Sequence, residues 1–498
     1  MKKTIIQFLF ILLFVSSSFA KLLTNYNDLK LFLDEKERIY EEITNQYGLS
    51  TWYVYSQEGK PDLDTPSEEY AELFSDEKLN QVIDEWYSKL NEIKDEKLKI
   101  RVVIWKRILT AAKVNYDDEI SGYRNQLEEW ISNKKDPERP SEEKLSEMVL
   151  DLMKMRNAKV KELGYSDYGD FILELSGQGI KSFYSMIDEM LKTTDAPYNE
   201  ILSKLEKEGK ELNFRNLMPY FRFSSRLKID IPSEKYQEVL SETLSDIGMN
   251  YKQMPIRFVD KQIPYGGNCI SVNIPKDVRI VCLPAAGLRT RMHELGHGLQ
   301  TVFTEVSSPM LKGYEWCLGS ANGLAYFEGM AETIARFYTN PVWLKKHTKL
   351  SDEEIKNADI QDKYMSAVSL RFSIANFLVE FELYKNLDKD PNEVQNAVYK
   401  RIFKGDLKSP RPVNLASVFY VAYPCYVQNY LIADIISWQV HKTLKEKFGE
   451  NFVLKKETGE FLKKYLYNDG VTRHWQKRLS DATGKKLDIT GYLKYKGL

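Results

Sequence analysis

The stretch RMHELGHGLQ, from Arg291 to Gln300, contains two of the five histidines of this 498-residue chain. His293 and His297 are four residues apart, and positions with that spacing lie one above the other on the same face of an α-helix. Two imidazoles presented in this way can bind one metal ion, and Zn²⁺ accepts imidazole nitrogens at about 2.0–2.1 Å. The spacing therefore predicts half of a tetrahedral zinc site.

Glu294 directly follows the first of these histidines. On a helix it flanks the metal-binding face without binding the metal, and there a carboxylate can take a proton from the attacking water. The H-E-x-x-H pattern is typical of metal-assisted peptide hydrolysis. Gly296 and Gly298 each cost the helix about 1 kcal/mol relative to alanine. Their presence indicates a close approach by the substrate or by a crossing helix.

A catalytic zinc site has three protein ligands and keeps a further position open. Glu305 is excluded as the third ligand, because it would lie about 11–12 Å beyond His297 along the helix axis. Glu315 lies in an irregular segment and stays an alternative. The stretch AYFEGMAETIARFY predicts a second helix, with Glu328 and Glu332 one turn apart at the edge of its apolar side. We expect Glu328 to bind the metal and Glu332 to accept the N–H of a ligand histidine.

Helical periodicity runs through most of the chain. In SEEKLSEMVLDLMKMRNAKVKELG, Ser141 can cap a helix that Gly164 ends, and apolar residues recur every three or four positions. Between residues 255 and 284, the short runs PIRFVD, NCISVNIP and VRIVCLP predict a few strands. Helical patterns resume from Leu288. The sequence therefore predicts an all-α fold with one small β-sheet.

Residues 1–20, MKKTIIQFLFILLFVSSSFA, have the basic start, apolar run and small-residue end of a secretory signal peptide. We expect a secreted or periplasmic protein in which residues 21–498 form a single domain. The 71 basic and 72 acidic residues give no charge excess that would indicate binding to nucleic acid. Residues 413–440 are apolar and as long as a membrane span, but Pro424 and Asp434 favour a buried helix. We therefore expect no stable membrane insertion.

HELGH, followed about thirty residues later by FEGMAE, resembles the gluzincin zinc metallopeptidases of the angiotensin-converting-enzyme (peptidyl-dipeptidase A) family and the related thimet oligopeptidase and oligopeptidase F families. RNAKVKELGYSDYGDF, KDVRIVC, YPCYVQNYLIADIISWQVHK and HWQKRLSDATGKKLDITGYL are similar to stretches of the converting-enzyme family. The resemblance implies a largely helical, two-lobed ellipsoid with zinc in a deep central cleft that admits short peptides. It also implies a disulfide between Cys269 and Cys282, whereas a pairing of Cys317 with Cys425 stays open.

The resemblance further implies that Tyr430 hydrogen-bonds the oxyanion formed during peptide hydrolysis. A phenol suits this role, because it is neutral at pH 7 and its O–H is directional. Tyr423 matches a tyrosine of the oligopeptidases. If the segment is helical, the seven-residue spacing of Tyr423 and Tyr430 places both phenols on one side.

Several positions differ from the converting-enzyme pattern. Tyr420 stands where that family has a transition-state histidine. Val418 and Val427 replace the lysine and tyrosine that hold the terminal carboxylate of the substrate. Asn429 replaces a chloride-linked arginine. These differences argue against the release of C-terminal dipeptides and against chloride activation at that position.

Together the residues predict an exported, monomeric zinc metallopeptidase that hydrolyses short peptides, of oligopeptidase or peptidyl-dipeptidase type, with one Zn²⁺ per chain. One alternative is a catalytically silent, peptide-binding helical protein on the same scaffold, which would not need the base Glu294. Another is a zinc aminopeptidase, which would need an acidic site for the free amine of its substrate. No GAMEN-like segment for that purpose is present in the sequence.

Overall fold

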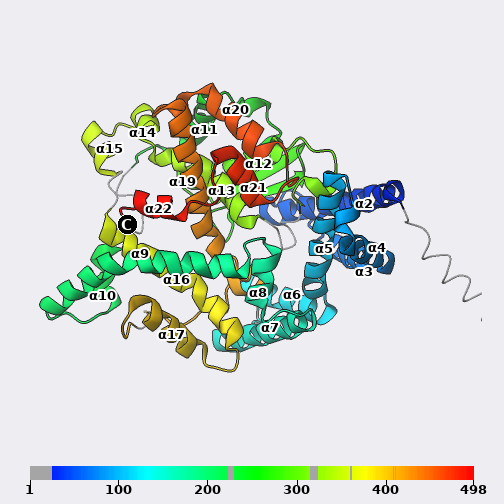
Figure 1. Ribbon diagram of the computed structural model, residues 1–498, viewed down its shortest axis with the longest axis horizontal. Helices are drawn as coiled ribbons and strands as arrows, with labels where there is room; N and C mark the ends of the chain where they lie inside the picture. Colours follow the sequence, from blue (N-terminus) through cyan, green and yellow to red (C-terminus); the bar gives the residue numbers. More distant parts are fainter. Residues whose placement is uncertain (1–24, 222–228, 315–322, 359–361, 408, 410) are drawn as a thin grey trace, which may run out of the picture.

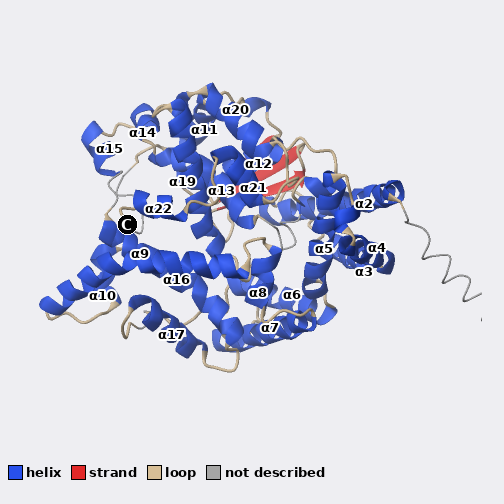
Figure 2. Ribbon diagram, viewed as in Figure 1, coloured by secondary structure: helices blue, strands red, loops and turns tan. Residues whose placement is uncertain are grey.

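The computed structural model of the chain describes residues 25–221, 229–314, 323–358, 362–407, 409 and 411–498. Helices make up most of these residues, and one three-stranded sheet lies among them (Figure 2). The expected all-α class with one small β-sheet is therefore confirmed. The expected signal peptide, residues 1–20, lies outside the described residues.

The N-terminal half is a series of helices, most of which begin at a side-chain cap. Ser141 is the cap expected from the sequence, and its hydroxyl accepts a hydrogen bond from the backbone N–H of Lys144. The helix ends just before Gly164, whose φ of +92° lies in the left-handed region that favours glycine. The helices are α2 (Tyr26–Ser56), α3 (Asp64–Ser75), α4 (Glu77–Ser88), α5 (Glu96–Asn115), α6 (Asp118–Ser132), α7 (Glu142–Glu162), α8 (Tyr168–Leu175), α9 (Ile180–Lys207), α10 (Phe214–Leu217) and α11 (Tyr236–Asp246).

Helices resume after the sheet, as expected. They are α12 (Leu288–Val302), α13 (Leu324–Ala335), α14 (Pro341–His347), α15 (Asp352–Ala358), α16 (Lys363–Lys385), α17 (Pro391–Phe403), α18 (Val418–Val421), α19 (Gln428–Phe448), α20 (Lys456–Leu462), α21 (Trp475–Thr483) and α22 (Ile489–Tyr495). Figure 1 shows α7, α8, α9, α16 and α17 in the lower half of the view and α11, α14, α15 and α20 in the upper half. The deep central cleft stays a prediction. Within the described part of the chain, no helix combines the length and the apolar character needed to cross a membrane.

The sheet lies just before the helix that carries the two histidines. Its strands are β1 (Ile256–Asp260), β2 (Gly267–Asn273) and β3 (Asp277–Cys282), in the order β1-β3-β2. β3 pairs with β1 in parallel and with β2 in antiparallel orientation, so β2 forms one edge. Gly298 of α12 faces the sheet, since a Cβ at this position would lie 3.4 Å from the side chains of both Ile256 and Ile280.

Two glycines let α12, α13 and α19 approach one another closely. A Cβ on Gly296 of α12 would lie 2.6 Å from the Cα of Ala331 in α13. A Cβ on Gly329 of α13 would lie 2.7 Å from the side chain of Ile436 in α19. Carbon atoms in van der Waals contact are about 3.5–4.0 Å apart, so only glycine fits at either crossing. The crossing helix that Gly296 indicates in the sequence is thus α13.

Residues 413–440 do not form the single buried helix expected from their composition. Helix α18 ends at Val421, and α19 begins only at Gln428. Pro424 lies between them, and the following Cys425 has a φ of +54°, so helical geometry is interrupted there. Tyr423 therefore lies in the connection and not on the helix of Tyr430, and the expectation based on their helical spacing is wrong.

The expected disulfide between Cys269 and Cys282 is also wrong, because both are buried free thiols. Strand register explains why. Cys269 lies opposite Ile280, and Cys282 lies opposite Gly267, so the two cysteines are diagonal neighbours on paired strands. Diagonal positions are about 7–8 Å apart, whereas the Cβ atoms of a disulfide are about 3.5–4.5 Å apart. Cys317, the partner considered for Cys425, lies outside the described residues.

The crossing of α12 and α13 generates a stability prediction. Gly296→Ala places a methyl group against the backbone of α13, and such overpacking typically costs about 1–3 kcal/mol. Gly122→Ala in α6 is the matched control, since a Cβ there meets nothing within 4 Å. The control should raise the free energy of unfolding by about 0.4–1 kcal/mol. Denaturant unfolding measures both, and a Gly296→Ala protein as stable as wild type would contradict the close crossing.

Candidate metal centre

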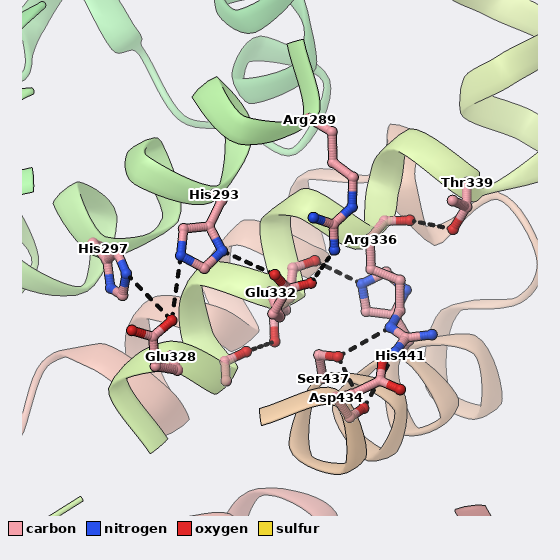
Figure 3. Close-up of polar contacts among 12 residues, drawn as sticks. Arg289, His293, His297, Glu328, Glu332, Arg336, Thr339, Asp434, Ser437 and His441 are labelled. Carbon is pink, nitrogen blue, oxygen red and sulfur yellow. Dashed lines mark hydrogen bonds and ion pairs between the residues drawn. The ribbon is translucent and has the colours of Figure 1, made fainter. Parts of the chain in front are cut away.

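Three side chains from α12 and α13 converge on one point (Figure 3). His293 Nε2 lies 3.3 Å from Glu328 Oε2, and His297 Nε2 lies 3.8 Å from the same oxygen. One ligand atom from each of the three residues lies within 4.8 Å of the other two. These are the three ligands expected from the sequence.

The two other carboxylates considered from the sequence are not in this group. α12 ends at Val302, and Glu305 is exposed beyond it, with its backbone N–H donating to the carbonyl of Asn468 at 2.7 Å. Glu315 lies outside the described residues.

The geometry of the group fits a metal ion. Two ligands of a tetrahedral zinc, each about 2.1 Å from the metal, are roughly 3.4 Å apart. Glu328 Oε2 is buried and has no hydrogen-bond partner among the described residues, a costly state for a carboxylate oxygen unless a cation binds it. Burial lowers the pKa of His297 to about 3, so its ring is neutral at pH 7 and can act as a ligand.

Glu332 lies behind His293, where the sequence places it. Its Oε1 is 2.9 Å from His293 Nδ1, and its Oε2 accepts a hydrogen bond from Arg289 Nη2 at 2.5 Å (Figure 3). Burial would raise the pKa of Glu332, but the hydrogen bond with His293 and the charge of Arg289 lower it. An ionised carboxylate on the far nitrogen fixes the orientation of an imidazole and makes it a stronger ligand.

Glu294 is held by the edge strand of the sheet. It is only 7 % exposed, and the backbone N–H of Cys269 in β2 donates to its carboxylate. A Cβ on Gly267 would lie 2.6 Å from Glu294 Cγ, so the glycine leaves room for this side chain. Burial raises the pKa of Glu294 to about 7. A carboxylate with a pKa near neutral can accept a proton and later return it.

Three tyrosines flank the metal ligands. Tyr426 lies between Tyr423 and Tyr430, with ring centroids 5.8 Å and 5.6 Å away. Tyr426 donates its hydroxyl hydrogen to Glu328 Oε1, which leaves Oε2 to face the histidines. Tyr423 and Tyr430 are 44 % and 43 % exposed, so their rings are open to solvent. Burial of its hydroxyl and the charges of Glu328 and Glu294 raise the pKa of Tyr430, which keeps this phenol neutral.

A pocket lined by both polar and apolar residues begins one turn along α12 from His297. Phe327 stacks on the His297 ring at 4.2 Å and contributes to the pocket wall, together with Gln300 and Thr304. Lys312 and Arg473 also line it. None of the three metal ligands lines this pocket, and Phe327 connects its wall to the His297 ring.

Sequence reasoning missed three residues of this site. Arg289 is one turn before His293 on the same helical face, and that spacing was a usable signal. Gly267 belongs to a glycine pair next to a strand, a sign of close backbone approach. Tyr426 had no such signal, because its position depends on the break between α18 and α19.

No protein-family model matches the chain, and no curated protein matches it either. Solved structures do match over nearly the whole chain. Pyrococcus furiosus carboxypeptidase has a TM-score of 0.67 at 15% sequence identity, covering 96% of this chain and 99% of that chain. Trypanosoma cruzi metallocarboxypeptidase 1 has a TM-score of 0.62 at 13% identity, covering 95% and 99%.

The M32 carboxypeptidase from Deinococcus radiodurans gives a similar result, with a TM-score of 0.62 at 16% identity and coverage of 94% and 97%. At these identities the similarity concerns the fold. The chain thus has the fold of these metallocarboxypeptidases from one end of the described region to the other.

Proposed function

We propose that this protein is a zinc-dependent peptidase that hydrolyses short peptides. The observation that carries the proposal is the convergence of His293, His297 and Glu328 beside the buried carboxylate of Glu294. Two imidazoles and one carboxylate are a ligand set that zinc favours, and three protein ligands with one open position are typical of catalytic zinc. The fold shared with metallocarboxypeptidases supports the same class of reaction.

The zinc ion, when bound, would polarise the carbonyl of the scissile bond and make water more acidic. Glu294, whose carboxylate is buried beside the ligands, takes a proton from the attacking water. The N–H of Cys269 and the backbone at Gly267 hold the carboxylate in place. Glu294 then delivers the proton to the leaving amine. Tyr430 donates its phenolic hydrogen to the oxyanion, and Tyr423 is a second candidate donor.

Cleavage at the C-terminus, one residue at a time, is the mode that we propose. Three structures with this fold, matched over at least 94% of the chain, are named carboxypeptidases. Val418 and Val427, which replace carboxylate-binding residues of the converting-enzyme pattern, argue against dipeptide release. Oligopeptidase and peptidyl-dipeptidase activities are the alternatives that the sequence resemblance supports.

We further propose that the mature protein, residues 21–498, is exported to the periplasm or the exterior and acts as a monomer on short peptides. The basic and apolar pattern of residues 1–20 supports export. The near balance of 71 basic and 72 acidic residues supports a function without nucleic acid.

Purified protein should contain one zinc ion per chain, measurable by elemental analysis. His297→Ala and Glu328→Gln each remove a ligand and should leave far less than one equivalent. Glu332→Gln should keep the ligands but weaken zinc binding by roughly 10–100-fold, because it removes the charged partner of His293. Glu315→Gln is the control and should retain full zinc. Loss of zinc in the control but not in Glu328→Gln would show that the wrong carboxylate is assigned.

Glu294→Gln tests chemistry separately from binding. Its amide cannot accept the proton of water, yet it is nearly isosteric with the carboxylate and leaves both histidines intact. The variant should keep zinc and peptide affinity and lose nearly all turnover. Tyr430→Phe should lower kcat by roughly 10²–10³ with little change in KM, as loss of one oxyanion donor does. Wild-type turnover in Glu294→Gln would refute the mechanism and favour the silent-binding alternative.

A panel of end-blocked peptides, analysed by mass spectrometry, tests the cleavage mode. A carboxypeptidase shortens N-acetylated peptides by one residue at a time and leaves C-terminally amidated peptides intact. A peptidyl-dipeptidase would release residues in pairs, and an oligopeptidase would cut peptides blocked at both ends. An aminopeptidase would fail on the N-acetylated set. We expect the first pattern, abolished by a chelator and absent in Glu294→Gln.

A further inference from the structure

Two buried ionisable side chains from distant helices meet on the segment that contains Tyr423 and leads into Tyr426. Arg156 belongs to α7 and is 2 % exposed, and Glu380 belongs to α16 and is 4 % exposed. Both contact residues 420–425, which comprise the end of α18 and the first part of the connection to α19. Burial of an arginine charge is costly, and burial raises the pKa of Glu380 to about 8, so their common target indicates a specific purpose.

Arg156 binds the first part of this connection. Its Nη1 donates to the carbonyl of Tyr420 at 2.9 Å, and its Nη2 donates to the carbonyl of Val421 at 2.5 Å. Carbonyls at the end of a helix have no partner within that helix, and here α18 ends at Val421. One planar guanidinium therefore satisfies two successive carbonyls and fixes their orientation.

Glu380 binds the second part of this segment, at Cys425. Its carboxylate accepts a hydrogen bond from the backbone N–H of Cys425 at 2.8 Å. Cys425 has a φ of +54°, a conformation that a residue with a side chain keeps only when its surroundings fix it. On the other side of the same residue, Gln428 Nε2 donates to the Cys425 carbonyl.

The next residue after Cys425 is Tyr426, which donates its hydroxyl hydrogen to the metal-facing carboxylate of Glu328. The Tyr426 ring in turn packs between Tyr423 and Tyr430. The orientation of the Cys425 backbone thus determines where the Tyr426 side chain points. Tyr426 in turn fixes the position of Glu328 Oε1 by its hydrogen bond.

We propose that Arg156 and Glu380 are positioning residues for the metal centre. They hold residues 420–425 so that Tyr426 orients Glu328 and Tyr430 faces the reacting carbonyl. Neither of them touches the metal ligands. The role in turnover rests on the proposed peptidase function, whereas the role in holding Glu328 concerns metal binding alone.

Two variants of Glu380 with similar size separate positioning from packing. Glu380→Gln keeps an oxygen that can accept from Cys425 N–H, and Glu380→Leu does not. Glu380→Leu should lower kcat by roughly 10–100-fold, because a shift of about 1 Å in the catalytic groups has an effect of this size. The KM should stay within about threefold of the wild-type value. Zinc should dissociate roughly 10-fold faster, measured by transfer to a chromogenic chelator. Glu380→Gln should stay within about threefold of wild type in both measurements.

Arg371 provides a matched control for Arg156. It is also a buried arginine, 1 % exposed, and it also donates to two backbone carbonyls, those of Leu191 and Ile402, on elements that carry no site residue. It differs in one contact, since its Nη2 also pairs with the carboxylate of Asp195. Arg156→Met and Arg371→Met should both lower thermal stability. Only Arg156→Met should lower kcat and speed zinc release in the folded protein.

Equal kcat and zinc release in Glu380→Leu and wild type would overturn the proposal, as would equal losses in Arg156→Met and Arg371→Met. If Glu380→Leu does not fold, Arg156→Lys is the deciding variant, because a lysine can reach only one of the two carbonyls. Unchanged kcat and zinc release in Arg156→Lys would then overturn the proposal. If the wild-type protein cleaves no peptide, the proposed function fails, and zinc release still tests the positioning of Glu328.

Discussion

The close crossing of α12 and α13 is the constraint on which the rest of the site depends. Gly296 meets the backbone of Ala331 with no room for a side chain. Because the helices touch there, Glu328 lies opposite the two imidazoles and Glu332 lies behind one of them. A third ligand from another helix then needs no mobile loop to reach the metal. Backbone contact between two rigid elements gives the ligands their fixed spacing.

The sheet contributes to the same centre from the other side of α12. Gly298 faces side chains of β1 and β3, and the edge strand β2 reaches Glu294 through the Cys269 N–H. A small sheet in a helical protein therefore serves to bury and orient one carboxylate. Burial raises the pKa of this carboxylate, which favours its uptake of a proton.

Local pattern predicted much of this arrangement. The four-residue spacing of His293 and His297, the adjacent Glu294, and the helix of Glu328 and Glu332 are short-range features, and helical geometry fixes them. The all-α class and the small sheet also follow from periodicity. The segment 413–440 was mispredicted, because its apolar composition resembles one helix while the break at Pro424 and Cys425 depends on distant partners. The Cys269–Cys282 bridge was mispredicted because strand register is not visible in the sequence.

The sequence does not show which distant residues hydrogen-bond to the region around the connection between α18 and α19. Arg156 and the carbonyl of Val421 are separated by 265 residues, and Gln178 donates to Asn429 across 251 residues. The stretch RNAKVKELGYSDYGDF resembles a stretch of the converting-enzyme family, and in the structure its side chains make specific long-range contacts. Its Asn157 accepts from the Tyr168 N–H and donates to the Tyr384 carbonyl, which joins α7, α8 and α16. The stretch therefore joins three helices through Asn157 and contacts the end of α18 through Arg156, although these partners are far apart in the sequence.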